Sequence, residues 1–358
     1  MNYNLEIQKI LLQCEGLSNP EDKINRLKQA IQLADVNNDV DWGYELRLNL
    51  ISEETNLPYF IDSFPAFAWV LNALEAEPDR FDEEGCLWLY KWMATAAYSY
   101  ADTPYAEVEK IFSDMKNRIL ANGYSLRGYY STLIYWEALR GDIDSAARYL
   151  EIQKKEEKDI LSDESDFELD TQIEMALLQG DFDQAVYLSE QFPESSKGFF
   201  PFATYSYMTY YLNKAGDERA ERFYRQAEEA LMDMEPNIKC IIDCVSCLIS
   251  YTAVHDRKRA WELFETYSEW EVKSIDSMSF LFSKNVLSLL SRKEEVSLKL
   301  SPKHPCFKQD SIYNSEELYA YYYTKARDLA ERFDKRNQTD YYKELFQQQV
   351  DISIDKSE

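Results

Sequence analysis

Apolar residues recur at steps of three and four along almost the whole chain. Ile24, Leu27 and Ile31 form one such stripe. This spacing places the apolar side chains on one face of a helix. Asn19 followed by Pro20 marks the start of that helix, because Asn caps free N–H groups and Pro fits the first helical position. We expect roughly seventeen helices joined by short turns, and no segment alternates with a period of two.

A short motif repeats where one helix is expected to end and the next to begin. Residues 141–146 read Gly-Asp-Ile-Asp-Ser-Ala, and residues 180–185 read Gly-Asp-Phe-Asp-Gln-Ala. Gly tolerates the left-handed conformation that ends a helix, Asp caps the following helix, and Ala lets the two helices approach closely. Looser copies occupy 215–220, 101–106 and 255–260. The alanines at 106, 146, 185, 220 and 260 are separated by 40, 39, 35 and 40 residues, a period typical of α-solenoids.

The best unit of this repeat resembles the tetratricopeptide-repeat family over roughly residues 85–270. Its matching packing residues are Tyr211, Ala220, Tyr224 and Ala227, and a less complete set is Tyr251, Ala260 and Phe264. The resemblance implies an all-α, right-handed α-solenoid of antiparallel helix hairpins, a tetratricopeptide-like superhelix. The steps exceed that family's 34 residues, so a degenerate solenoid of longer helices fits equally well. The pattern does not decide whether the superhelix is open or closed on itself.

The chain divides into four expected segments. Residues 1–80 form an N-terminal helical cap that continues into the array, and residues 81–290 form the repeat array. Residues 291–313 form an irregular connector, because Ser301-Pro302 and His304-Pro305 break helices. Residues 314–358 form capping helices at about 315–334 and 339–350, followed by a frayed tail from Asp351.

Composition narrows the class of protein. Lys and Arg number 39 against 65 Asp and Glu, which gives a net charge of −26. Nucleic acids and anionic membranes would be repelled by such a chain. Only 9 Gly and 10 Pro argue against an all-β fold. The N-terminus lacks the pattern of a signal peptide, and the longest uncharged run is too short for a membrane span, so we expect a cytoplasmic protein with reduced thiols.

No cofactor, metal or catalytic motif is found. The glycines form no phosphate loop, and the two histidines, His255 and His304, lack companions that would complete a metal site. Cys240, Cys244 and Cys247 form the most suggestive cluster, but they fall within a helical run, which favours core packing. The acidic stretches 75–84 and 151–174 are interpreted as solvated helix faces and a polar loop.

Aromatic residues carry the functional hypothesis. The 27 Tyr, 18 Phe and 7 Trp concentrate on the expected first helices, which line the concave groove in tetratricopeptide arrays. Four tyrosines between 205 and 211 cover too wide an arc for one stripe, so some must leave the core. The candidate contacts are Trp88, Lys91, Tyr98, Tyr135, Tyr205 and Asn213.

The first hypothesis is a non-catalytic module that binds a basic or amphipathic peptide or protein in this acidic, aromatic groove. The alternatives are a peptide-responsive regulatory protein or a toxin-neutralising partner of bacterial type. A third hypothesis is an enzyme with an unrecognised carboxylate site.

Overall fold

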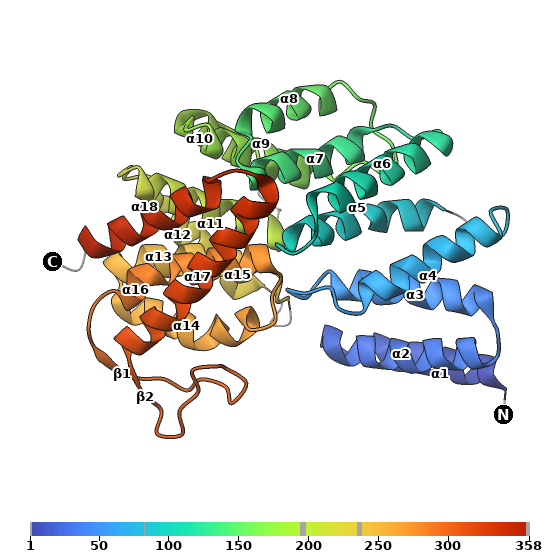
Figure 1. The fold of residues 1–358 in the computed structure, drawn as a ribbon, viewed down its shortest axis with the longest axis horizontal. Helices are drawn as coiled ribbons and strands as arrows, with labels where there is room; N and C mark the ends of the chain where they lie inside the picture. Colours follow the sequence, from blue (N-terminus) through green and yellow to red (C-terminus); the bar gives the residue numbers. More distant parts are fainter. Residues whose placement is uncertain (1, 82, 194–197, 235–237, 356–358) are drawn as a thin grey trace.

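The computed structural model describes residues 2–81, 83–193, 198–234 and 238–355. These residues form eighteen helices and one small sheet (Figure 1). The helices are α1 (Tyr3–Glu15), α2 (Pro20–Val36), α3 (Val40–Glu54), α4 (Ser63–Ala76), α5 (Glu84–Ser99), α6 (Tyr105–Ala121), α7 (Arg127–Arg140), α8 (Ile143–Gln153), α9 (Ser165–Leu178), α10 (Phe182–Ser189), α11 (Phe199–Lys214), α12 (Ala220–Asp233), α13 (Ile242–His255), α14 (Arg257–Glu271), α15 (Asp276–Asn285), α16 (Leu287–Leu290), α17 (Ser315–Asn337) and α18 (Tyr341–Asp355). Strands β1 (Glu295–Ser297) and β2 (Ile312–Asn314) pair antiparallel.

Consecutive helices pack as hairpins, and the hairpins stack into a helical solenoid, as predicted. Among the first helices, α5 contacts α7, and α9, α11, α13 and α15 each contact the next. Side chains link α7 to α9, where the hydroxyl of Tyr135 lies 3.0 Å from that of Thr171. The second helices, such as α12, lie on the outside and bury only one stripe, which in α12 is Ala220, Phe223, Ala227 and Leu231. Helix α13 lies between neighbours on several sides, and most of its residues from Ile242 to Ala253 are buried.

The turns follow the motif read from the sequence. Gly141 and Gly180 adopt φ values of +82° and +76°, the left-handed conformation that ends a helix. Asp142 then accepts a hydrogen bond from the backbone N–H of Ser145, at 3.0 Å. Asp181 caps the following helix in the same way. Local turn chemistry therefore sets where these hairpins fold back.

Ala106 is the exception among the five repeat alanines. The other four are buried, whereas Ala106 is exposed, so the expectation of a close helix approach there is wrong. Helix α6 begins directly after Pro104, two residues later than the motif places it. The packing position three residues after this start is taken by Val108, which is 1% exposed.

The last of the first helices, α15, contacts the segment that follows α5. The carboxylate of Asp276, at the start of α15, accepts a hydrogen bond from the backbone N–H of Ala101, just after α5, at 2.8 Å. Arg336, near the end of α17, donates to the carbonyls of Tyr98 and Tyr100 at 2.6 and 2.9 Å. Its guanidinium lies between the rings of Trp136 and Phe333. The solenoid is therefore closed on itself by contacts between segments far apart in sequence (Figure 1).

The N-terminal hairpins take part in this closure. The carbonyl of Asn56 accepts hydrogen bonds from the N–H groups of Lys239 and Cys240, at 2.9 and 3.3 Å. The carbonyl of Pro58 accepts one from Ile275 at 2.7 Å. The turn between α3 and α4 thus contacts the turns before α13 and α15.

The C-terminal part differs from the prediction in two places. The irregular connector contains β1 and the start of β2, which are too short to show a period of two. The tail from Asp351 is helical through Asp355, so the expected fraying from Asp351 is wrong. The apolar residues Tyr342, Phe346 and Val350 recur every four positions and are buried against the core, which stabilises the preceding part of this helix.

Candidate functional site

Two predicted groove residues are buried within the fold. Tyr98 is 2% exposed, and its ring centroid lies 5.4 Å from that of Trp136. Lys91 donates to the carbonyl of Leu161 at 2.8 Å and pairs with Asp163 at 2.7 Å. Trp88 covers the Lys91 ammonium, with its ring centroid 3.7 Å from Nζ. Lys91 and Tyr98 therefore do not line an open groove in this structure.

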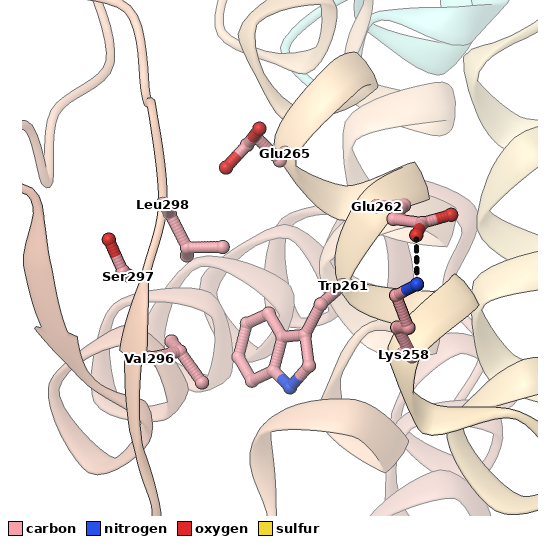
Figure 2. Close-up of a pocket in the computed structure, with 7 residues that line it drawn as sticks. All are labelled: Lys258, Trp261, Glu262, Glu265, Val296, Ser297 and Leu298. Atoms are coloured by element: carbon pink, nitrogen blue, oxygen red, sulfur yellow. Dashed lines mark ion pairs between the residues drawn. The ribbon is translucent and has the colours of Figure 1, made fainter.

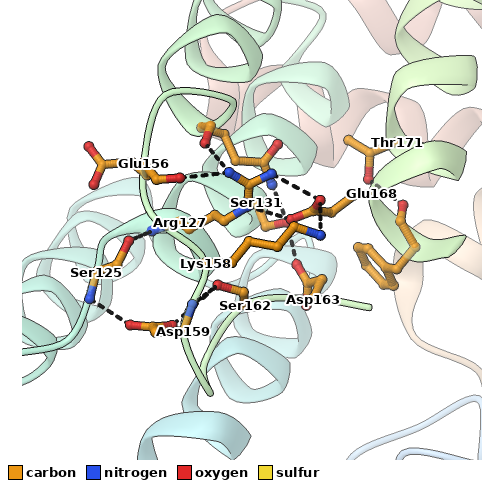
Figure 3. A network of polar contacts seen from close by, with 12 residues as sticks. Ser125, Arg127, Ser131, Glu156, Lys158, Asp159, Ser162, Asp163, Glu168 and Thr171 are labelled. Atoms are coloured by element: carbon orange, nitrogen blue, oxygen red, sulfur yellow. Dashed lines mark hydrogen bonds and ion pairs between the residues drawn. The ribbon is translucent and has the colours of Figure 1, made fainter. Parts of the chain in front are cut away.

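A polar network that includes Arg127 and Glu168 fixes the long connection between α8 and α9 (Figure 3). Glu168 pairs with Arg127 at 2.6 Å and with Lys158 at 2.8 Å. Burial acts against ionisation of Glu168, but these two hydrogen-bonded cations outweigh it and lower its pKa. Asp159 accepts a hydrogen bond from the backbone N–H of Ser125 at 2.6 Å. These acids hold the connection in place, which corrects the interpretation of the whole stretch 151–174 as solvated.

The other three predicted residues lie in different surroundings. The hydroxyl of Tyr135 lies 3.0 Å from that of Thr171. Tyr205 packs its ring between Phe192 and Phe223, and Asn213 lies near the surface, 3.2 Å from Nε2 of His255. The structure does not gather the six predicted residues into one groove. Among the six, Tyr98 and Tyr135 lie near enough to the site described next for the charge of its Glu174 to contribute to their raised pKa values.

Three carboxylates from two first helices lie near enough to one another for the charges of Asp170 and Asp243 to raise the pKa of Glu174. Asp170 and Glu174 lie one turn apart on α9, and Asp243 lies near the start of α13. Asp170 accepts a hydrogen bond from the hydroxyl of Thr204. Asp243 accepts one from the hydroxyl of Tyr207 at 2.8 Å. We call Asp170, Glu174 and Asp243 the acid cluster.

Glu174 is the member of the acid cluster that lacks any compensation. Burial, with the negative charges of Asp170 and Asp243, raises the pKa of Glu174 to about 8. Burial also raises the pKa of Asp170 to about 7, and that of Asp243 is raised by the same cause. Among the described residues, no Lys or Arg contributes to the pKa of Glu174 or Asp170, and none donates a hydrogen bond to Glu174. No neighbouring cation therefore compensates the negative charge of these two acids when they are ionised.

Tyrosines surround this cluster. The charge of Glu174 contributes to the raised pKa values of Tyr135, Tyr207, Tyr211 and Tyr341, after the larger effect of burial. These tyrosines come from α7, α11 and α18 and are only partly buried, so the interior keeps some contact with solvent. The faces of aromatic rings attract cations, as carboxylates do. The arrangement is suited to holding a positively charged group.

Lys284, the lysine of α15, does not neutralise the acid cluster. Lys284 is 3% exposed and donates to the hydroxyl of Tyr210 at 2.8 Å. Burial lowers its pKa to about 8, and no member of the acid cluster contributes to that value. Tyr210 in turn contacts Gln349 of α18. Lys284 therefore links α15 to α11 and α18 and leaves the acid cluster uncompensated.

Two cysteines of α13 and one of the histidines are buried in the packing of the helices and the connector. Cys244 and Cys247 are buried in α13, and burial raises the pKa of both thiols, so they are protonated at neutral pH. His304 is buried, with Nδ1 accepting from the N–H of Cys306 and Nε2 lying 2.9 Å from the hydroxyl of Tyr322. Across the residues that the structure describes, no group of three or more His, Cys, Asp and Glu is arranged to hold a metal ion.

The sequence contained a weak signal for this site. The tyrosines of 205–211 stand out by density, and Asp170 and Glu174 have the spacing of one helix face. Nothing local distinguishes these two acids from the many others in the stretch 151–174. Their special environment comes from α11 and α13, which sequence reasoning did not place around them.

Comparison with known proteins identifies no relative. Neither protein-family models, nor curated proteins, nor solved structures match this chain. No helix within the described ranges is both long enough and apolar enough to cross a membrane.

Proposed function

We propose that the chain is a binding protein that takes a basic side chain of a peptide or protein partner between its first helices. The observation that carries this proposal is Glu174, an acid with a raised pKa, no hydrogen-bond donor among the described residues and no nearby cation. Tyrosines frame the carboxylate, as in sites that recognise ammonium groups. The resemblance to peptide-binding helical repeats agrees with this function at the level of architecture.

An inserted ammonium or guanidinium group would change the protonation of the site. Near pH 7 most of the Glu174 side chains carry a proton, because their pKa is about 8. A cation beside the carboxylate favours the ionised form and lowers that pKa. Binding therefore releases up to about one proton below pH 8.

The charge of the whole molecule favours the same class of partner. A net charge of −26 attracts basic chains over distances of about a Debye length, which is ~8 Å at physiological salt. Association should therefore slow as salt is added, while the contact with the buried acids is screened less.

The test is isothermal titration calorimetry with a tetralysine peptide, in two buffers of different ionisation enthalpy. We expect binding with proton release at pH 7, and about tenfold or greater weakening in Glu174→Gln. The matched control is Glu229→Gln, which changes an exposed acid on α12. A peptide with acetylated lysines should not bind. Equal affinity and equal proton release in Glu174→Gln and the wild type would reject the proposal.

A further inference from the structure

A groove on the surface of the molecule contains none of the residues of the acid cluster. This groove, of about 280 Å³, lies between α14 and β1 (Figure 2). It is lined by Lys258, Trp261, Glu262, Glu265, Val296, Ser297 and Leu298. The ring of Trp261 faces Val296 and Leu298 across the groove. The volume is slightly below the ~300 Å³ at which small-molecule sites begin, so the groove has the size for one or two side chains of a peptide.

The walls of the groove combine an aromatic ring with carboxylates. The indole N–H of Trp261 donates to Glu294 at 2.9 Å, which fixes the orientation of the ring. Glu265 points toward β1, and its carboxylate accepts a hydrogen bond from the backbone N–H of Lys299 at 2.8 Å. Glu262 lies on the same side of α14, turned toward Lys258, and pairs with Arg259 at 3.4 Å. Lys258, the one cation among the lining residues, has an 89% exposed side chain that lies 3.7 Å from Glu262, so this ion pair is weak. A long aliphatic side chain with a positive end matches these walls.

The backbone of β1 adds a second recognition element. Leu298 donates its N–H to the carbonyl of Ser311, and Ser315 donates to the carbonyl of Glu294. Hydrogen-bonded pairs alternate along an antiparallel ladder, so the N–H and C=O of Ser297 point away from β2. Ser297 also lines the groove. Free backbone groups at a strand edge beside a groove are the arrangement to which extended peptides add as a further strand.

We propose that this groove is a docking site for an extended basic segment of a partner protein. The segment pairs with the free N–H and C=O of Ser297 on β1 and places a Lys or Arg side chain against Trp261, toward Glu265. The acidic walls and the net charge of −26 select a basic segment over an acidic one. This docking is independent of the acid cluster.

The first test changes only the backbone edge. The probe is a fluorescein-labelled peptide, Thr-Lys-Val-Lys-Val-Thr, and the readout is fluorescence polarisation with the full chain. Ser297→Pro removes an N–H that no bond to β2 uses, and an edge position tolerates proline. We expect binding to weaken by about tenfold in Ser297→Pro and to stay within about twofold in Ser297→Ala, which keeps the N–H. Equal binding by both variants, or no binding by the wild type at millimolar peptide, overturns the proposal.

The second test changes only side-chain charge, so its result does not depend on whether the proline variant folds. The double variant Glu262→Gln/Glu265→Gln keeps side-chain length and should weaken the same peptide by about tenfold. A Thr-Glu-Val-Glu-Val-Thr peptide should not bind the wild type. Glu174→Gln should leave this binding unchanged, which separates the groove from the interior site. A concentration-dependent dimer in sedimentation that Ser297→Pro abolishes would assign the edge to a second copy of this chain and refute the peptide.

Discussion

Replacing Glu174 by Gln gives the sharpest prediction of the interior electrostatics. Gln has the shape of a protonated Glu but cannot ionise. The pKa of this group rises from 4.5 to about 8 on folding. Its contribution to the free energy of unfolding is therefore fully present below about pH 4.5 and is lost as the pH rises through about 8. Glu174→Gln should remove this loss.

The magnitude follows from the two pKa values. A tenfold change in a protonation equilibrium corresponds to about 1.4 kcal/mol, so the full difference corresponds to about 4–5 kcal/mol. The side chain keeps some solvent contact, and screening reduces the effect to about 2–3 kcal/mol. We expect the variant to match the wild type at pH 5 and to be more stable by this amount at pH 9.

The assay is urea unfolding followed by circular dichroism at each pH from 5 to 9. Glu229→Gln serves as the control, because an exposed acid should give a difference that does not depend on pH. The slope of the transition must agree between variants for the midpoints to be compared. A stability difference between Glu174→Gln and the wild type that stays constant from pH 5 to pH 9 would refute the account of the acid cluster.

Three further predictions concern the closed fold. Arg336→Ala should lower the free energy of unfolding by about 3 kcal/mol in urea titrations, because it removes a buried cation that binds two backbone carbonyls; no loss would show that the closure is weak. Gly141→Ala should lower the melting temperature more than Gly180→Ala. Both positions have positive φ, but only at Gly141 would the added Cβ lie 2.5 Å from the ring of Tyr341. Equal losses in melting temperature would contradict this packing. The pKa of buried His304 is lowered from 6.5 to about 4, so stability is present above pH 6.5 and is lost as the pH falls through about 4. His304→Gln should flatten this part of the stability profile, and an unchanged acid limb would argue against a buried neutral imidazole.

The parts of the fold that depend on neighbouring residues could be predicted from the sequence. The predicted turns at Gly141 and Gly180 are confirmed, because a left-handed glycine and an Asp cap act within a segment of six residues. Ala106 was placed wrongly, since Pro104 moves the start of its helix by two positions. Both the success and the failure come from local backbone chemistry.

The interior site depends on contacts that no local pattern encodes. Arg336 binds carbonyls more than 230 positions earlier in the chain, and a carbonyl carries no side-chain identity that a sequence would reveal. Glu174 is unusual only because α11 and α13 surround it with Asp243 and tyrosines. The candidate groove residues failed to converge for the same reason. Membership of a first helix does not specify which neighbour each face meets.

The return of the first helices to their starting point limits how this molecule can change. An open solenoid behaves as a spring that stretches under load and gains or loses units at either end. Here an added or deleted hairpin would shift Asp276 and Arg336 away from the end of α5, so the number of units is fixed by geometry. Mechanical pulling should meet one cooperative rupture in place of gradual extension.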